Sequence, residues 1–141
     1  IELVRVKDGV RYYNDSIASS PSRTIAGLRS FPEKVILIAG GYDKHIPYDV
    51  LGPEICAHVK KLFLGGATGP KIRAAVEQAP EYVPGHPEIV DCADFTAATL
   101  AAAKAAQPGD VVLMSPASAA FDQFKNFMVR GQYFKKLVKE L

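Results

Sequence analysis

The sequence lacks the features that mark several specialised classes of protein. No apolar run approaches the about 20 residues that span a bilayer, and the chain does not begin with the basic, apolar and small-residue segments of a signal peptide. The formal net charge of +2 is too small for a surface that tracks nucleic-acid phosphates. We therefore expect no membrane and no nucleic-acid partner, and a cytoplasmic location unless an upstream segment is missing.

Cysteine and the common catalytic motifs are also scarce. Cys56 and Cys92 have no CxxC spacing and no histidine cluster beside them, which predicts core positions in a reducing compartment. His45, His58 and His86 are too scattered for a metal site. GxxxxGK[ST], GxGxxG and GxSxG are absent, so no known phosphate fingerprint lets the chain hold a nucleoside triphosphate by itself.

What the sequence does contain is an alternation of strand and helix patterns over the length of one domain. Polarity alternates at 2–6 and 10–13 around Asp8-Gly9, which predicts a hairpin. Unbroken apolar runs typical of strands covered on both faces lie at 35–39, 61–64 and 110–114, and a weaker strand pattern lies at 88–91. The chain therefore opens with an antiparallel pair and continues with strands of a parallel sheet.

Helices are expected between these strands. Their predicted ranges are 21–31 with Ser20 as N-cap, 50–59, 69–78, 94–106 capped by Asp94, and a last helix from Gly131 to Leu141 or slightly longer. Strands that alternate with helices imply right-handed crossovers. The predicted fold is a single α/β domain: a mainly parallel sheet with helices on both faces, preceded by the antiparallel hairpin.

The loops after three predicted strands are the candidate ligand sites, because ligands gather beyond the carboxyl ends of parallel strands. They are 40–44 (GGYDK), 65–69 (GGATG) and 115–118 (SPAS). Their glycines permit close backbone approach, although any such fold needs glycine at these turns. Lys44 is suited to neutralise a carboxylate or phosphate, or else is a solvated loop lysine. The residue patterns alone predict an anion- or small-ligand-binding α/β domain.

Three segments together resemble the C-terminal domain of the Mur ligases, especially of the members that add D-glutamate. They are VRYYNDSIASSP (10–21), LIAGGYDK (37–44) and GDVVLMSPASAAFDQFKNFMVRGQYF (109–134). The resemblance implies the Rossmann-like third domain of a peptidoglycan-synthesis enzyme that forms an amide through an acyl phosphate. ATP and Mg²⁺ would bind mainly to a central domain, and UDP-N-acetylmuramoyl-L-alanine to an N-terminal domain. The domain alone is expected to be inactive.

The resemblance also implies roles for individual residues. Asp15 and Ser16 would contact the nucleotide, and Ser19 and Lys44 would hold one carboxylate of D-glutamate. The backbone N–H of Phe127 would hold the other carboxylate.

Two positions depart from the family pattern. Ile17 stands where many members have lysine, and Ala120 where many have the serine that binds a D-glutamate carboxylate. Ser118 and the N–H groups of residues 119–121 are then the nearest replacement donors, and Arg23 is a candidate for the missing cation. A Mur-like ligase with another acceptor and a non-catalytic α/β binding module are therefore kept as alternatives.

Overall fold

The computed structural model describes residues 1–121 and 123–141. It contains a six-stranded sheet in the order β1-β2-β6-β3-β4-β5. The strands are β1 (Glu2–Lys7), β2 (Val10–Asn14), β3 (Val35–Ala39), β4 (Val59–Leu64), β5 (Glu88–Asp91) and β6 (Val111–Met114). β1 and β2 are antiparallel, and every other pairing is parallel. The predicted hairpin and mainly parallel sheet are confirmed.

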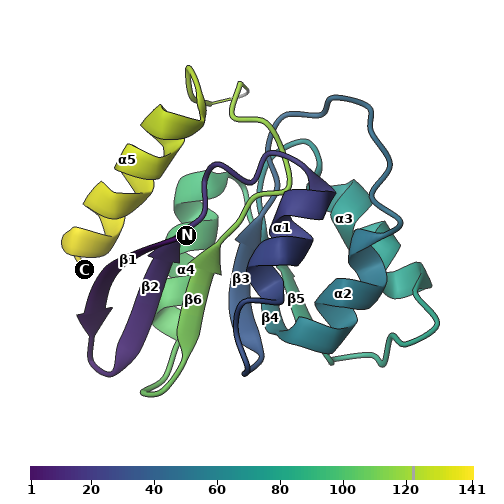
Figure 1. Ribbon diagram of the computed structural model, residues 1–141, viewed down its shortest axis with the longest axis horizontal. Coiled ribbons are helices and arrows are strands. Elements are labelled where there is room, and N and C mark those ends of the chain that lie inside the picture. Colours follow the sequence, from purple (N-terminus) through teal and green to yellow (C-terminus); the bar gives the residue numbers. More distant parts are fainter. Residues whose placement is uncertain (122) are drawn as a thin grey trace.

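Helices cover both faces of the sheet (Figure 1). They are α1 (Pro21–Leu28), α2 (Leu51–His58), α3 (Gly69–Gln78), α4 (Phe95–Ala105) and α5 (Phe127–Lys139). Neighbouring residues of a strand point to opposite faces. In β3, Leu37 therefore packs in the core beneath α1, α2 and α3, and Ile38 packs in the core beneath α4 and α5. Of the helices in the described ranges, none has the length and apolar character to cross a membrane.

Of the two predicted N-cap residues, Asp94 makes the expected capping hydrogen bond and Ser20 does not. Asp94 caps α4 as expected, because its carboxylate accepts the N–H of Ala97 at 2.8 Å. Ser20 does occupy the N-cap position of α1, with Pro21 first in the helix, but its side chain makes no capping hydrogen bond. Its hydroxyl instead lies 3.3 Å from that of Ser22. The position was predicted correctly and the capping interaction was not.

The prediction for the last helix was short at its start. α5 begins at Phe127, four residues before Gly131. The helix starts there because Asn126 has an extended backbone and its side chain accepts the N–H of Val129 at 2.9 Å. The extra turn brings Phe127 and Arg130 into hydrogen-bond contact with the loops that follow β2 and β6.

The two cysteines are only partly as expected. Cys56, on α2, is buried in the core, whereas Cys92 follows β5 and is half-buried. Burial raises the pKa of both thiols. Both therefore carry a neutral thiol near neutral pH.

Candidate ligand site at the carboxyl edge of the sheet

Four loops meet at one edge of the sheet because β2, β6, β3 and β4 are parallel neighbours. Backbone hydrogen bonds join the loop after β3 to the loop after β6. Gly40 donates its N–H to the carbonyl of Pro116 at 2.9 Å, and Tyr42 donates to that of Ala119 at 2.9 Å. The loops predicted to carry the ligand contacts therefore form one connected surface.

The glycines of these loops serve close packing of the backbone. Gly40 has φ +107°, and a Cβ there would lie 1.8 Å from the carbonyl oxygen of Gly65. A Cβ on Gly65 would lie 2.8 Å from the carbonyl oxygen of Asp94. No side chain fits at such distances. The need for glycine at tight turns of this fold therefore explains Gly65, the first glycine of its loop, and it also explains Gly40.

Three buried hydroxyls hold the loops together from below. Ser118 Oγ lies 2.7 Å from Thr68 Oγ1 and 3.0 Å from the hydroxyl of Tyr48. Thr68 Oγ1 also accepts the N–H of Gly41 at 2.9 Å. The side chain of Ser118 is fully buried. Its predicted contact with substrate stays a prediction, and the position observed for its hydroxyl is internal.

Lys44 and Ser19 come together, although they follow different strands. The ammonium group of Lys44 donates to the carbonyl oxygen of Ser19 at 3.0 Å, at the surface. The carboxylate of the neighbouring Asp43 is paired with Lys71 at 2.7 Å. Lys71 holds the pKa of Asp43 below its ordinary value. Asp43 is therefore neutralised from another side, and the charge of Lys44 is directed at the Ser19 segment.

Asp15 belongs to a buried polar cluster. Its carboxylate accepts the hydroxyl of Ser115 at 2.8 Å, and Ser115 in turn lies 2.9 Å from Thr24 Oγ1. Burial raises the pKa of Asp15, and the hydrogen bond from Ser115 opposes that rise. A hollow of about 250 Å³ opens beside it, with Arg23 among its lining residues. A hydrogen-bond acceptor and a cation thus border the same space.

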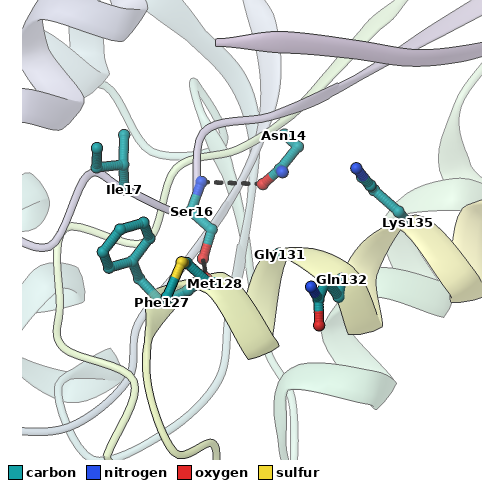
Figure 2. Close-up of a pocket in the computed structure, with 8 residues that line it drawn as sticks. All are labelled: Asn14, Ser16, Ile17, Phe127, Met128, Gly131, Gln132 and Lys135. Carbon is teal, nitrogen blue, oxygen red and sulfur yellow. Dashed lines mark hydrogen bonds between the residues drawn. The ribbon is translucent and has the colours of Figure 1, made fainter.

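A second hollow, of about 270 Å³, lies between the end of β2 and α5 (Figure 2). Its lining residues are Asn14, Ser16, Ile17, Phe127, Met128, Gly131, Gln132 and Lys135. Ser16 donates its hydroxyl to the carbonyl of Phe127 at 2.7 Å, which ties the loop after β2 to the first turn of α5. Ser16 itself is buried, so the residue predicted to contact nucleotide has a hydroxyl already engaged inside the protein.

Arg130 is a site residue that the sequence analysis missed. Its side chain is buried, with 2% exposed, and donates to the hydroxyl of Ser16 at 2.9 Å, to the carbonyl of Ser16 at 2.7 Å and to the carbonyl of Ser118 at 2.8 Å. The predicted helix started one residue too late to include it. The available signal was the position of Arg130 directly after the apolar residues Phe127-Met128-Val129.

The two departures from the family pattern have contrasting surroundings. Ile17 is 48% exposed and lines both hollows, whereas Ala120 is 3% exposed. Within residues 1–121 and 123–141, no three His, Cys, Asp or Glu side chains come together as metal ligands.

The structure is an α/β domain with an exposed lysine, Lys44, at the carboxyl edge of its sheet. The family model described as "Mur ligase, glutamate ligase domain" matches residues 1–118, and the chain belongs to this family.

Two relatives carry the name UDP-N-acetylmuramoylalanine--D-glutamate ligase. The Acetivibrio thermocellus protein is 54% identical over 143 residues, which cover 100% of this chain and 31% of that protein. The Clostridium beijerinckii protein is 50% identical over 99% of this chain and 31% of its own length. The chain thus spans about a third of the length of these relatives.

Solved structures share the fold. A murein peptide ligase from Psychrobacter arcticus superposes with a TM-score of 0.62 at 12% identity, over 99% of this chain and 30% of that one. A domain from Haemophilus ducreyi, assigned to a UDP-N-acetylmuramate:L-alanyl-gamma-D-glutamyl-medo-diaminopimelate ligase, gives a TM-score of 0.61 at 14% identity, over 99% of this chain and 94% of that one.

Proposed function

We propose that this chain is the C-terminal, amino-acid-binding domain of a three-domain cytoplasmic ligase that adds D-glutamate to UDP-N-acetylmuramoyl-L-alanine in peptidoglycan synthesis, at the expense of ATP. The observation that carries the proposal is the convergence of Lys44 and Ser19, 3.0 Å apart between Nζ and the carbonyl oxygen. The names of relatives at 54% and 50% identity support the choice of acceptor.

The residues of this domain bind and orient the amino acid. The Lys44 ammonium and the Ser19 hydroxyl hold one carboxylate, since charge-assisted hydrogen bonds are the strong ones. The N–H of Phe127 holds the other, because groups in the first turn of a helix have no partner within it and favour anions. Two anchored carboxylates fix the direction of the amine. Alignment of this kind is a large part of the rate of a two-substrate reaction.

ATP, bound with Mg²⁺ mainly by the central domain, supplies the phosphoryl group that activates the alanyl carboxylate. From this chain, the nucleotide would be met by Asp15 and Arg23 at the smaller hollow. The buried carboxylate of Asp15 fits a hydroxyl partner, because an ionised carboxylate only accepts hydrogen bonds. The domain also brings the amine toward the activated carboxylate while its cations offset negative charge.

The test is an amino-acid panel with the full-length enzyme, using UDP-N-acetylmuramoyl-L-alanine and ATP and measuring phosphate release. D-Glutamate should be the preferred acceptor, and the 141-residue chain alone should give no turnover. Efficient ligation of another amino acid, with D-glutamate refused, would establish the alternative acceptor. Turnover by the isolated chain would refute its dependence on other domains.

A further inference from the structure

We propose that Arg130 is a positioning residue that fixes the two segments holding the amino acid, a role that rests on the proposed function. Arg130 is on the first turn of α5, and its side chain is buried. Its hydrogen bonds run to Ser16 and Ser118, which begin the segments 16–19 and 118–121. These segments carry Ser19 and the backbone donors nearest to the departure at Ala120.

The three bonds come from one planar group, two of them to Ser16 and one to Ser118. Nε and Nη2 bind the hydroxyl and carbonyl of Ser16 at 2.9 and 2.7 Å, and Nη1 binds the carbonyl of Ser118 at 2.8 Å. A guanidinium presents its donors in a rigid fork, whereas a lysine presents one rotating ammonium on a flexible stem. The geometry therefore specifies arginine and not merely a positive charge.

Holding a carbonyl also orients the next N–H. A peptide unit is planar, and in its trans form the N–H points opposite to the carbonyl. The Ser16–Ile17 and Ser118–Ala119 peptides are trans. By binding both carbonyls, Arg130 fixes the planes from which both segments start, and turns the N–H groups of Ile17 and Ala119 away from itself.

Ser16 extends the arrangement to the third predicted contact. Its hydroxyl accepts from Arg130 and donates to the carbonyl of Phe127 at 2.7 Å. The start of α5, whose Phe127 N–H is predicted to bind substrate, is thereby fixed to the same loop. One side chain and one hydroxyl hold the two loops and the helix in a single arrangement.

A purely structural role makes a different prediction. Replacing a buried charged network mainly affects stability if the network only packs the loops. A positioning role predicts in addition a higher KM for D-glutamate. The rise should exceed that caused by another substitution in α5 that lowers stability by the same amount. Val138 supplies the comparison, because it is fully buried in the same helix, at the end far from the loops.

The experiment compares Arg130→Lys with Val138→Ala in the full-length enzyme. Arg130→Lys should raise KM for D-glutamate by about tenfold or more, the size expected when charge-assisted bonds that orient substrate donors are lost. KM for ATP should change less than about threefold. Val138→Ala should lower Tm without raising KM for D-glutamate. Equal KM values in the two variants, with wild type active on D-glutamate, would overturn the positioning role.

Two further measurements test the positioning role if Arg130→Lys does not fold or if wild type does not use D-glutamate. If Arg130→Lys does not fold, Ser16→Ala removes one acceptor and leaves both carbonyls, and should raise KM for D-glutamate about threefold to tenfold; no rise overturns the proposal. If wild type does not use D-glutamate, the proposed function fails by itself. The amide resonances of Ile17 and Ala119 then decide the positioning: shifts confined to Arg130→Lys support it, and shifts equal to those of Val138→Ala contradict it.

Discussion

The loops at the carboxyl edge are fixed in two different ways. Behind β3 and β4, backbone packs directly on backbone, as where a Cβ on Gly40 would lie 1.8 Å from the carbonyl oxygen of Gly65. Behind β2 and β6, a guanidinium spans the gap and binds three oxygen atoms of Ser16 and Ser118. The first pair of loops excludes side chains from the contact, and the second depends on one.

The two kinds of contact therefore fix different things: the position of one pair of loops, and the direction of the hydrogen-bonding groups in the other pair. Tight backbone packing positions the loop that carries Lys44, and the long lysine side chain then reaches the carbonyl oxygen of Ser19. The segments after β2 and β6 instead offer hydroxyl and N–H groups, whose direction matters for binding. Changes at the packed glycines themselves should therefore mainly affect folding, and changes at Arg130 and Ser16 should mainly affect substrate use.

The largest expected effect is on stability, from Gly40→Ala. The positive φ and the contact with Gly65 must both be relieved, so the free energy of unfolding should fall by more than about 3 kcal/mol. Chemical denaturation of the chain measures this. The matched control is Gly85→Ala, at φ +83° with nothing within 4 Å of the added Cβ. The control should lose only about 1–2 kcal/mol, and equal losses would show that packing against Gly65 adds nothing.

Next in size is Lys44→Ala in the full-length enzyme. Loss of a charge-assisted bond to the substrate should lower kcat/KM for D-glutamate by about ten- to a hundredfold. The stability of the protein should hardly change, because the lysine is exposed. Lys104→Ala, on the exposed face of α4, is the charge-matched control and should leave kcat/KM unchanged. An unaltered kcat/KM in Lys44→Ala would make Lys44 a solvated loop residue.

The same contrast explains what could be predicted from sequence. The bounds of α3 and β5 agree with the predicted 69–78 and 88–91, because local periodicity defines them. The network of Arg130 with Ser16 joins residues 114 positions apart, and no local pattern encodes such a contact. The pairing of Lys44 with Ser19 was expected only through the family resemblance. The first turn of α5 was missed because its start is marked by a single residue, the capping Asn126.

A smaller effect is expected from Asp15→Asn. Burial raises the pKa of Asp15 in the folded state. Below the ordinary pKa of aspartate both states are protonated, and the group contributes nothing. As pH rises through that value toward the raised one, the unfolded state ionises first, so the folded protein loses stability.

The amide variant cannot ionise and can still accept from Ser115. Its unfolding midpoint should therefore exceed that of wild type at pH 7, and the difference should shrink toward pH 3. Thermal unfolding of both proteins across this range measures the difference. A gain of equal size at both pH values would contradict the assignment to Asp15 ionisation.

The smallest effect is expected from Ala120→Ser, at the buried position that departs from the family pattern. If backbone donors and Lys44 already hold D-glutamate, restoring the hydroxyl adds one hydrogen bond of about 1 kcal/mol, and KM for D-glutamate should fall by less than about tenfold. Ala120 is 3% exposed, so a hydroxyl that finds no partner would instead cost about 1–3 kcal/mol of stability. Steady-state kinetics of the full-length enzyme and denaturation of the chain separate the two cases. A lower KM with unchanged stability places the hydroxyl on the substrate, whereas an unchanged or higher KM would mean that this loop binds D-glutamate through its backbone alone.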